Sequence, residues 1–170
     1  MVVLAGHAYA GAVIGAVDDE RVKALVYIAA LAPAEGETVA QVFYRDEKHP
    51  KSPQLAPDAD GLIWMPEEGF GNAFAQHATA EQIALSAAVQ RPIALKCIQE
   101  PAPKPAWKSK PSWFLIAEED RMINPKTQHF MAERMGATVR STRADHTPMY
   151  TAADVVIDVI LEAARETPSR

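Results

Sequence analysis

The sequence has one cysteine, no excess of basic residues and no long apolar run, and each shortage excludes a class of protein. Cys97 stands alone, so an internal disulfide framework is excluded and a reducing cytoplasm is the expected compartment. No stretch approaches the roughly 20 apolar residues of a membrane-spanning helix. The formal net charge is -5, with acidic residues spread along the chain, which argues against a nucleic-acid partner.

What is present indicates one domain of ordinary size over residues 1–170. Hydrophobic residues make up 48% of the chain and charged residues 23%, which provides enough apolar side chains for a packed core. The chain has no basic segment before its first apolar run, and Asp18 and Asp19 follow soon after it. That run is therefore expected to be a folded strand and not a signal peptide. No residue cluster has the spacing of a metal site, and no cofactor is expected.

Short apolar strands alternate with helical patterns along the chain. Apolar runs without polar alternation predict strands buried on both faces. Pro125 at a first turn and Gly136 after a last turn are typical helix bounds. The predicted strands are residues 2–5, 23–29, 112–117 and 137–142, and the predicted helices are residues 9–17, 125–135 and 152–165. This order predicts an α/β fold, with a parallel sheet of about four strands flanked by helices.

Residues 33–110 differ in character, because prolines recur through them and only one helical pattern is clear. That pattern covers residues 79–90, with Thr79 as N-cap and Gln82 in capping-box spacing. The segment is predicted to be a mostly irregular and helical cap inserted into the domain, without sheet. Its aromatic residues either cover a pocket or pack against the body, and the sequence leaves both open. They are Phe43, Tyr44, Trp64, Phe70 and Phe74.

Three predicted strands end in distinctive turns, and parallel strands place functional loops at such ends. The turns are "GHAYAG", "AEED" and "ADHTPMY". Together with "VKALVYIAALAPAEGE" and "PSWFLIAEEDRMINPKTQHFMAERMGA", they resemble the α/β-hydrolase superfamily, specifically small bacterial esterase-like hydrolases related to the methylesterase and hydroxynitrile lyase group. The order nucleophile, acid, histidine is that of the superfamily. The resemblance runs through nearly the whole chain, which looks like the last two thirds of such a protein.

This resemblance implies Ser-His-Asp chemistry on small ester-like molecules. His146 matches the base, Asp120 matches the acid, and Ala8 stands where the family has its nucleophile. The backbone N–H of Tyr9 would bind the developing oxyanion. The strained turn needs small neighbours, which Gly6, Ala10 and Gly11 provide.

Two departures from the family pattern predict a damaged site. Ala8 has no attacking oxygen, and loss of the nucleophile costs about a million-fold in serine hydrolase turnover. The family's earlier strands and its glycine-rich oxyanion loop have no counterpart here, so the chain is expected to be N-terminally truncated. One edge of the strand at residues 2–5 would then be exposed, and exposed apolar edges pair with other chains. We therefore expect a homodimer, pairing with a separately supplied N-terminal part, or aggregation.

Three functions remain open at this stage. The first is an inactive or severely impaired member of an esterase-like lineage. The second is a non-catalytic binding or interaction module that keeps the pocket. The third is lyase-type chemistry in which His146 and Asp120 act as an acid–base dyad, independent of residue 8.

Simpler roles compete with the catalytic ones. Asp120 could pair with Arg121 or cap the following helix, and His146 could lie at the surface. His7 is expected to be a buried hydrogen-bonding residue. His77 is expected in a loop and His129 on a helix face, and neither has a partner at the spacing of a metal site.

Overall fold

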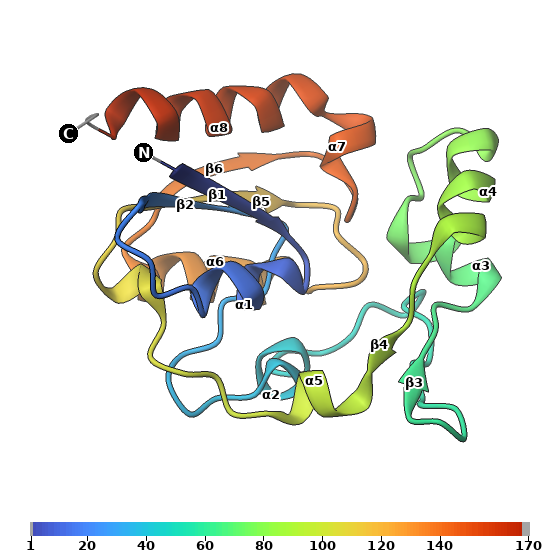
Figure 1. The fold of residues 1–170 in the computed structure, drawn as a ribbon. Coiled ribbons are helices and arrows are strands. Elements are labelled where there is room, and N and C mark those ends of the chain that lie inside the picture. The colour runs from blue at the N-terminus through green and yellow to red at the C-terminus, as the bar shows by residue number, and fades with distance from the viewer. Residues whose placement is uncertain (1, 168–170) are drawn as a thin grey trace.

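The computed structural model describes residues 2–167, and its centre is a four-stranded parallel sheet (Figure 1). The strands are β1 (Val2–His7), β2 (Val22–Ile28), β5 (Ser112–Ala117) and β6 (Thr138–Thr142), in the spatial order β1-β2-β5-β6. All three neighbouring pairs are parallel. The predicted α/β fold is confirmed, and each strand overlaps its predicted segment.

Helices cover both faces of this sheet (Figure 1). On one face, α8 (Ala153–Glu166) packs Val156 and Val159 against β2 and β5. On the other face, α1 (Ala10–Gly15) and α6 (Pro125–Met135) contribute Ile14 and Met131 to a second core. Side chains of β2 alternate between the two cores, as the period of a strand requires. Ala24, Val26 and Ile28 enter the first core, and Leu25 and Tyr27 enter the second.

Local signals at both ends explain why α6 has its predicted bounds. The Asn124 side chain caps the helix by accepting a hydrogen bond from the Lys126 backbone N–H at 2.9 Å. Pro125 occupies the first turn, where its missing N–H costs nothing. Gly136 ends the helix in the left-handed region at φ 61°, which glycine adopts without strain.

Part of the segment of residues 33–110 lies beyond the carboxyl ends of the sheet, and part lies below the layer of α1 and α6 (Figure 1). Its helices are short: α2 (Val39–Phe43), α3 (Glu67–Gly69), the π-helix η1 (Phe70–Phe74), α4 (Ala80–Val89), α5 (Leu95–Gln99) and the 3-10 helix η2 (Ala106–Lys108). The expected capping box of α4 is present, with Thr79 and Gln82 bonded to each other's backbone N–H.

The expectation that this segment contains no sheet is wrong. A two-stranded antiparallel ribbon joins β3 (Leu62–Ile63) to β4 (Ile93–Ala94). A strand of two residues is too short to show the alternation of polar and apolar side chains that predicts a strand. The ribbon forms through pairing of two segments that are distant in the sequence, and such pairing leaves no local pattern.

β1 lies at one edge of the sheet, with β2 as its strand partner in the described part of the chain. Val2 on this edge is 39% exposed. Pairing of the edge with another chain stays a prediction. No helix within residues 2–167 is long and apolar enough to cross a membrane.

Candidate active site

The turn after β1 holds Ala8 in the left-handed region at φ 51°, a conformation that residues other than glycine seldom adopt. Backbone hydrogen bonds fix it there. The Ala8 N–H donates to the Ile28 carbonyl at 3.3 Å, and the Ala8 carbonyl accepts from Gly11 at 3.1 Å and Leu31 at 2.9 Å. The turn therefore projects the side chain of residue 8 beyond the carboxyl end of the sheet.

Two glycines allow this turn to form, because the helix that follows lies very close to the strands. A Cβ on Gly6 would stand 2.7 Å from the Ala10 carbonyl oxygen. A Cβ on Gly11 would stand 2.4 Å from the Leu31 carbonyl oxygen. Both distances are shorter than non-bonded atoms tolerate, so the small residues expected from the sequence are sterically required at these two positions.

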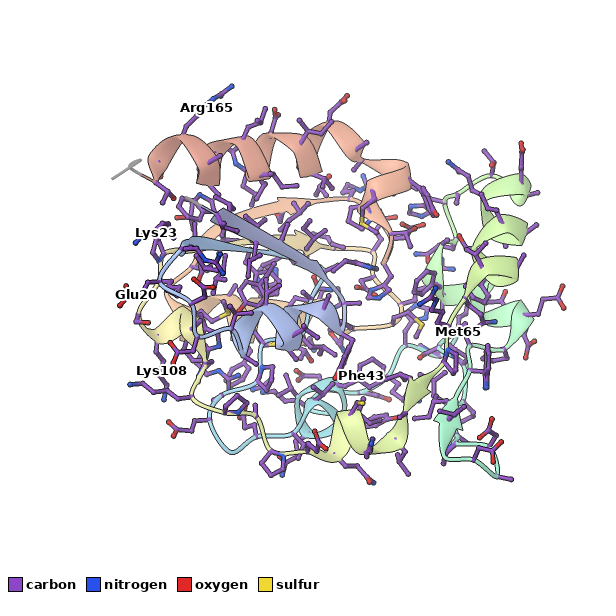
Figure 2. The ribbon with its side chains drawn as sticks, in the orientation of Figure 1. Glu20, Lys23, Phe43, Met65, Lys108 and Arg165 are labelled. Atoms are coloured by element: carbon purple, nitrogen blue, oxygen red, sulfur yellow. The ribbon has the colours of Figure 1, made fainter. Side chains whose placement is uncertain are left out.

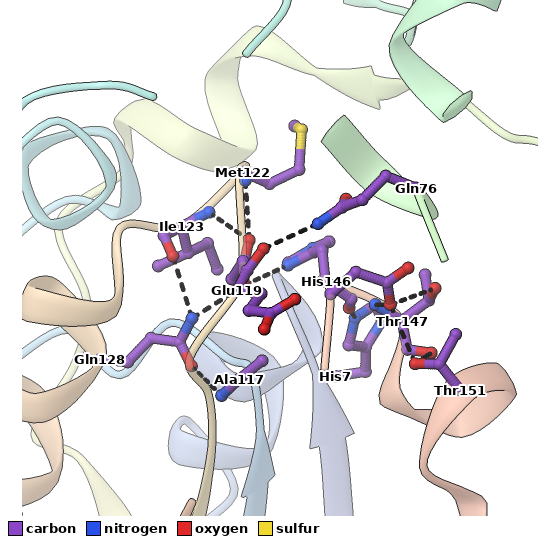
Figure 3. A network of polar contacts seen from close by, with 12 residues as sticks. His7, Gln76, Ala117, Glu119, Met122, Ile123, Gln128, His146, Thr147 and Thr151 are labelled. Carbon is purple, nitrogen blue, oxygen red and sulfur yellow. Dashed lines mark hydrogen bonds and ion pairs between the residues drawn. The ribbon is translucent and has the colours of Figure 1, made fainter. Parts of the chain in front are cut away.

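His146, labelled in Figure 3, forms a buried pair with Asp120, and the two residues follow the carboxyl ends of β6 and β5. Nδ1 of His146 lies 2.7 Å from Oδ2 of Asp120, and the residues are each 3% exposed. A carboxylate accepts, so Nδ1 carries the proton and Nε2 keeps a free lone pair. The structure thus joins the two residues that the sequence assigned as base and acid.

Further donors fix the Asp120 carboxylate in place. Its Oδ1 accepts from the backbone N–H groups of Met122 at 2.7 Å and Ile123 at 2.9 Å. Its Oδ2 accepts from Nε2 of Gln128 at 2.8 Å, beside the bond to His146. Asp120 does not pair with Arg121, whose guanidinium donates to the Asn72 carbonyl.

His7 supports the histidine turn from β1. Its Nε2 donates to the His146 carbonyl oxygen at 2.6 Å, and the two rings lie 4.7 Å apart between centroids. Burial, and secondly the neighbouring His146, lower the pKa of His7 to about 3. His7 is therefore neutral at pH 7, in agreement with the hydrogen-bonding role expected from the sequence.

A mostly apolar cavity of about 490 Å³ lies between the sheet and residues 33–110. Ala8 and His146 both line it, together with Tyr9, Leu31, Met122 and Ile123 from the body of the domain. Four of the five aromatic residues left open by the sequence also line it, namely Phe43, Tyr44, Phe70 and Phe74. Trp64 does not, and its indole N–H instead donates to Asp58 at 3.2 Å.

Tyr9 follows Ala8, as the predicted oxyanion donor should. Within residues 2–167 its backbone N–H donates to no other protein group, which leaves it free for a ligand oxygen. The Tyr9 hydroxyl donates to the Cys97 carbonyl at 3.5 Å, and burial raises the pKa of this phenol.

Sequence reasoning missed the role of Asp145, which is fully buried beside the base. Its Oδ1 accepts from the backbone N–H and the hydroxyl of Thr147, both at 3.0 Å, and from the Thr151 hydroxyl at 3.2 Å. Its Oδ2 accepts from the His77 backbone N–H at 2.8 Å. Asp145 thus ties the histidine turn to residues 33–110, and an aspartate in a polar turn gave no sign of this in the sequence.

His77 lies in the loop after η1, as expected. Its Nε2 lies 3.2 Å from Oε2 of Glu119, and the neighbouring Gln76 donates to the Glu119 carbonyl at 2.8 Å. These contacts bring the loop after η1 against the turn that bears the acid (Figure 3). His129 lies on a helix face as expected, paired with Glu118 at 3.0 Å. No group of metal-binding type occurs among the described residues.

Comparison with known proteins agrees with this architecture. A family model described as "Alpha/beta hydrolase family" matches residues 2–159. No curated protein sequence matches the chain.

Solved structures with the same fold include several esterases. Polyneuridine aldehyde esterase superposes with a TM-score of 0.73 at 16% identity, covering 96% of this chain and 71% of the other. A methylesterase from Arabidopsis gives 0.75 at 16%, covering 96% and 69%. A pyrethroid hydrolase from Sphingobium faniae gives 0.73 at 19%, covering 96% and 72%. Since the family match extends over most of its length, this chain belongs to the alpha/beta hydrolase family.

Proposed function

We propose that this protein carries the acyl-hydrolase site of an esterase-like lineage, with His146 as base and Asp120 as acid. Ala8 then occupies the nucleophile position, and residues 33–110 form the cap over the substrate. One observation carries the proposal: His146, which is paired with Asp120, and the left-handed turn at Ala8 line a single cavity. The apolar lining suits a small ester, the class of substrate that the names of the similar structures indicate for those proteins.

With a serine at residue 8, each part of this site has a defined task. The hydroxyl passes its proton to Nε2 of His146 as its oxygen attacks the ester carbonyl carbon. Asp120 holds Nδ1 protonated and stabilises the imidazolium. The Tyr9 N–H donates to the oxygen that becomes negative. The alcohol leaves with the proton from Nε2, and water then releases the acid by the same two steps.

With Ala8, the covalent step has no attacking atom. Removal of the serine from such a triad lowers turnover by about a million-fold. We therefore expect the chain to bind small esters in the cavity with little or no hydrolysis.

Ala8→Ser tests this assignment. The variant should hydrolyse 4-nitrophenyl acetate about a hundredfold or more faster than the unchanged protein, because it regains a nucleophile beside a base that is already present. Nitrophenolate release measures the rate. Ala16→Ser, which adds the same hydroxyl at the end of α1, is the matched control and should gain nothing. Adding His146→Ala to Ala8→Ser should remove the gain. A folded Ala8→Ser protein no faster than Ala16→Ser would contradict the proposal.

A second candidate is proton-transfer chemistry by His146 and Asp120 alone. The bond between Nδ1 and Asp120 leaves Nε2 as a base whatever residue 8 is. The unchanged protein would then release cyanide from a hydroxynitrile, and His146→Ala would abolish that release while Ala8→Gly would not. Saturable binding of esters, with neither reaction, would instead favour the binding module.

A further inference from the structure

Arg91 is the one permanently charged residue among those that line the cavity in the described part of the chain. Within residues 2–167 its guanidinium makes no ion pair and no hydrogen bond, and the residue is exposed. Most other arginines do pair with a carboxylate: Arg21, Arg45, Arg134, Arg140 and Arg143 each have one within reach. Arg91 thus lines a mostly apolar cavity and carries a guanidinium that no carboxylate of the described residues neutralises, which leaves it available to a ligand.

The backbone that carries Arg91 is held in place on both sides. The preceding Gln90 side chain bonds the Met65 backbone twice, accepting from its N–H at 3.1 Å and donating to its carbonyl at 3.2 Å. Pro92 follows, and proline restricts the residue before it to an extended backbone. Ile93 then pairs with Ile63 in the β3–β4 ribbon. Arg91 is thus presented from a fixed point, which reduces the entropy lost when it binds a partner.

The lining of the cavity therefore contains two basic side chains, His146 and Arg91, among mostly apolar ones. His146 lies on the side of the sheet, and Arg91 follows α4 on the side of residues 33–110. A guanidinium binds a carboxylate through two parallel hydrogen bonds, which a neutral ester cannot match in strength. We propose that the ligand of this site is an ester with an apolar chain that ends in a carboxylate, such as a monoester of a dicarboxylic acid. Arg91 binds the carboxylate while the ester group lies at His146. This inference rests on the proposed function, which supplies the ester.

Binding to the unchanged protein tests the inference directly, because Ala8 prevents turnover of the probes. Calorimetry measures the affinity for monomethyl esters of dicarboxylic acids of increasing chain length, and for the corresponding dimethyl esters. Arg91→Gln should weaken binding of the best monomethyl ester about five- to tenfold, the range of partly exposed charged pairs. It should leave the dimethyl ester within about twofold, since the neutral ligand makes no charged contact. Added salt should weaken the monoester in the unchanged protein and have little effect in Arg91→Gln.

Arg165→Gln is the matched control, because it removes the same charge from α8, well away from Met65 (Figure 2), which lines the cavity. It should leave both affinities unchanged. Circular dichroism should show Arg91→Gln folded, since an exposed residue without ion pairs contributes little to stability.

The outcomes separate the two proposals. If Arg91→Gln alters both esters equally, or neither, the role of Arg91 is overturned, while hydrolysis of a neutral ester by Ala8→Ser would still support the proposed function. If neither ester binds and Ala8→Ser is inactive, both proposals fall.

Discussion

Acid should destabilise this protein through His7, and His7→Gln should remove that part of the loss. The pKa of His7 falls from 6.5 in an exposed chain to about 3 in the fold, chiefly through burial. At a pH between these values, the imidazole of His7 binds a proton in the unfolded chain but not in the folded chain. Stability from this group is therefore complete above pH 6.5 and declines as the pH falls toward 3. At about 1.4 kcal/mol per pH unit, acidification to about pH 4.5 should cost roughly 2–3 kcal/mol through His7.

Urea unfolding of both proteins at neutral and acidic pH measures this contribution. Glutamine is the matched replacement, because its amide can still donate to the His146 carbonyl and does not titrate. The carboxylates that also titrate in this range are the same in both proteins, so their effects cancel in the difference. The unchanged protein should lose roughly 2–3 kcal/mol more than His7→Gln on acidification. Equal losses in the two proteins would refute the claim that the fold keeps His7 neutral.

Two further substitutions test the packing around the site. Gly11→Ala places a Cβ 2.4 Å from the Leu31 carbonyl oxygen and should lower the unfolding free energy by about 2–3 kcal/mol. Gly71→Ala is the control, because its Cβ meets nothing closer than 3.9 Å and the substitution should be nearly neutral. Thermal melts measure both variants, and equal losses of stability would contradict the close approach of Gly11 to Leu31. Both carboxylate oxygens of Asp145 accept hydrogen bonds, so the NH₂ group of Asp145→Asn must face a donor on one side or the other. The substitution should lower the unfolding free energy by about 2–3 kcal/mol. It should also speed proteolysis near His77, and an unchanged cleavage rate would show that this tether is dispensable.

The sheet and its flanking helices were predictable because their signals are local. Residues 112–117 form a short apolar run that predicts a strand buried on both faces, and β5 has these bounds. Pro125 and Gly136 mark the ends of α6 in the sequence as they do in the structure. The capping-box spacing of Thr79 and Gln82 likewise predicts the start of α4.

The site was predictable only in part. The turns that bear residues 8, 120 and 146 could be identified from their order and their place after strands. What lies between them could not, because long-range contacts leave no local pattern. The contact of Asp145 with the His77 backbone spans 68 residues, and the β3–β4 ribbon pairs Ile63 with the distant Ile93. The short helix α7 (Pro148–Thr151) was missed for a related reason, since a single turn has no periodicity to detect.

The hydrogen bonds that shape the turn at residue 8 are all made by backbone atoms, and the methyl group of Ala8 takes no part in them. The geometry of this turn is thus independent of whether residue 8 bears an oxygen, a sulfur or only hydrogen on its Cβ. Codons for alanine and serine differ by a single base. Genetically, this scaffold stands one point substitution away from placing a hydroxyl in the cavity that His146 also lines.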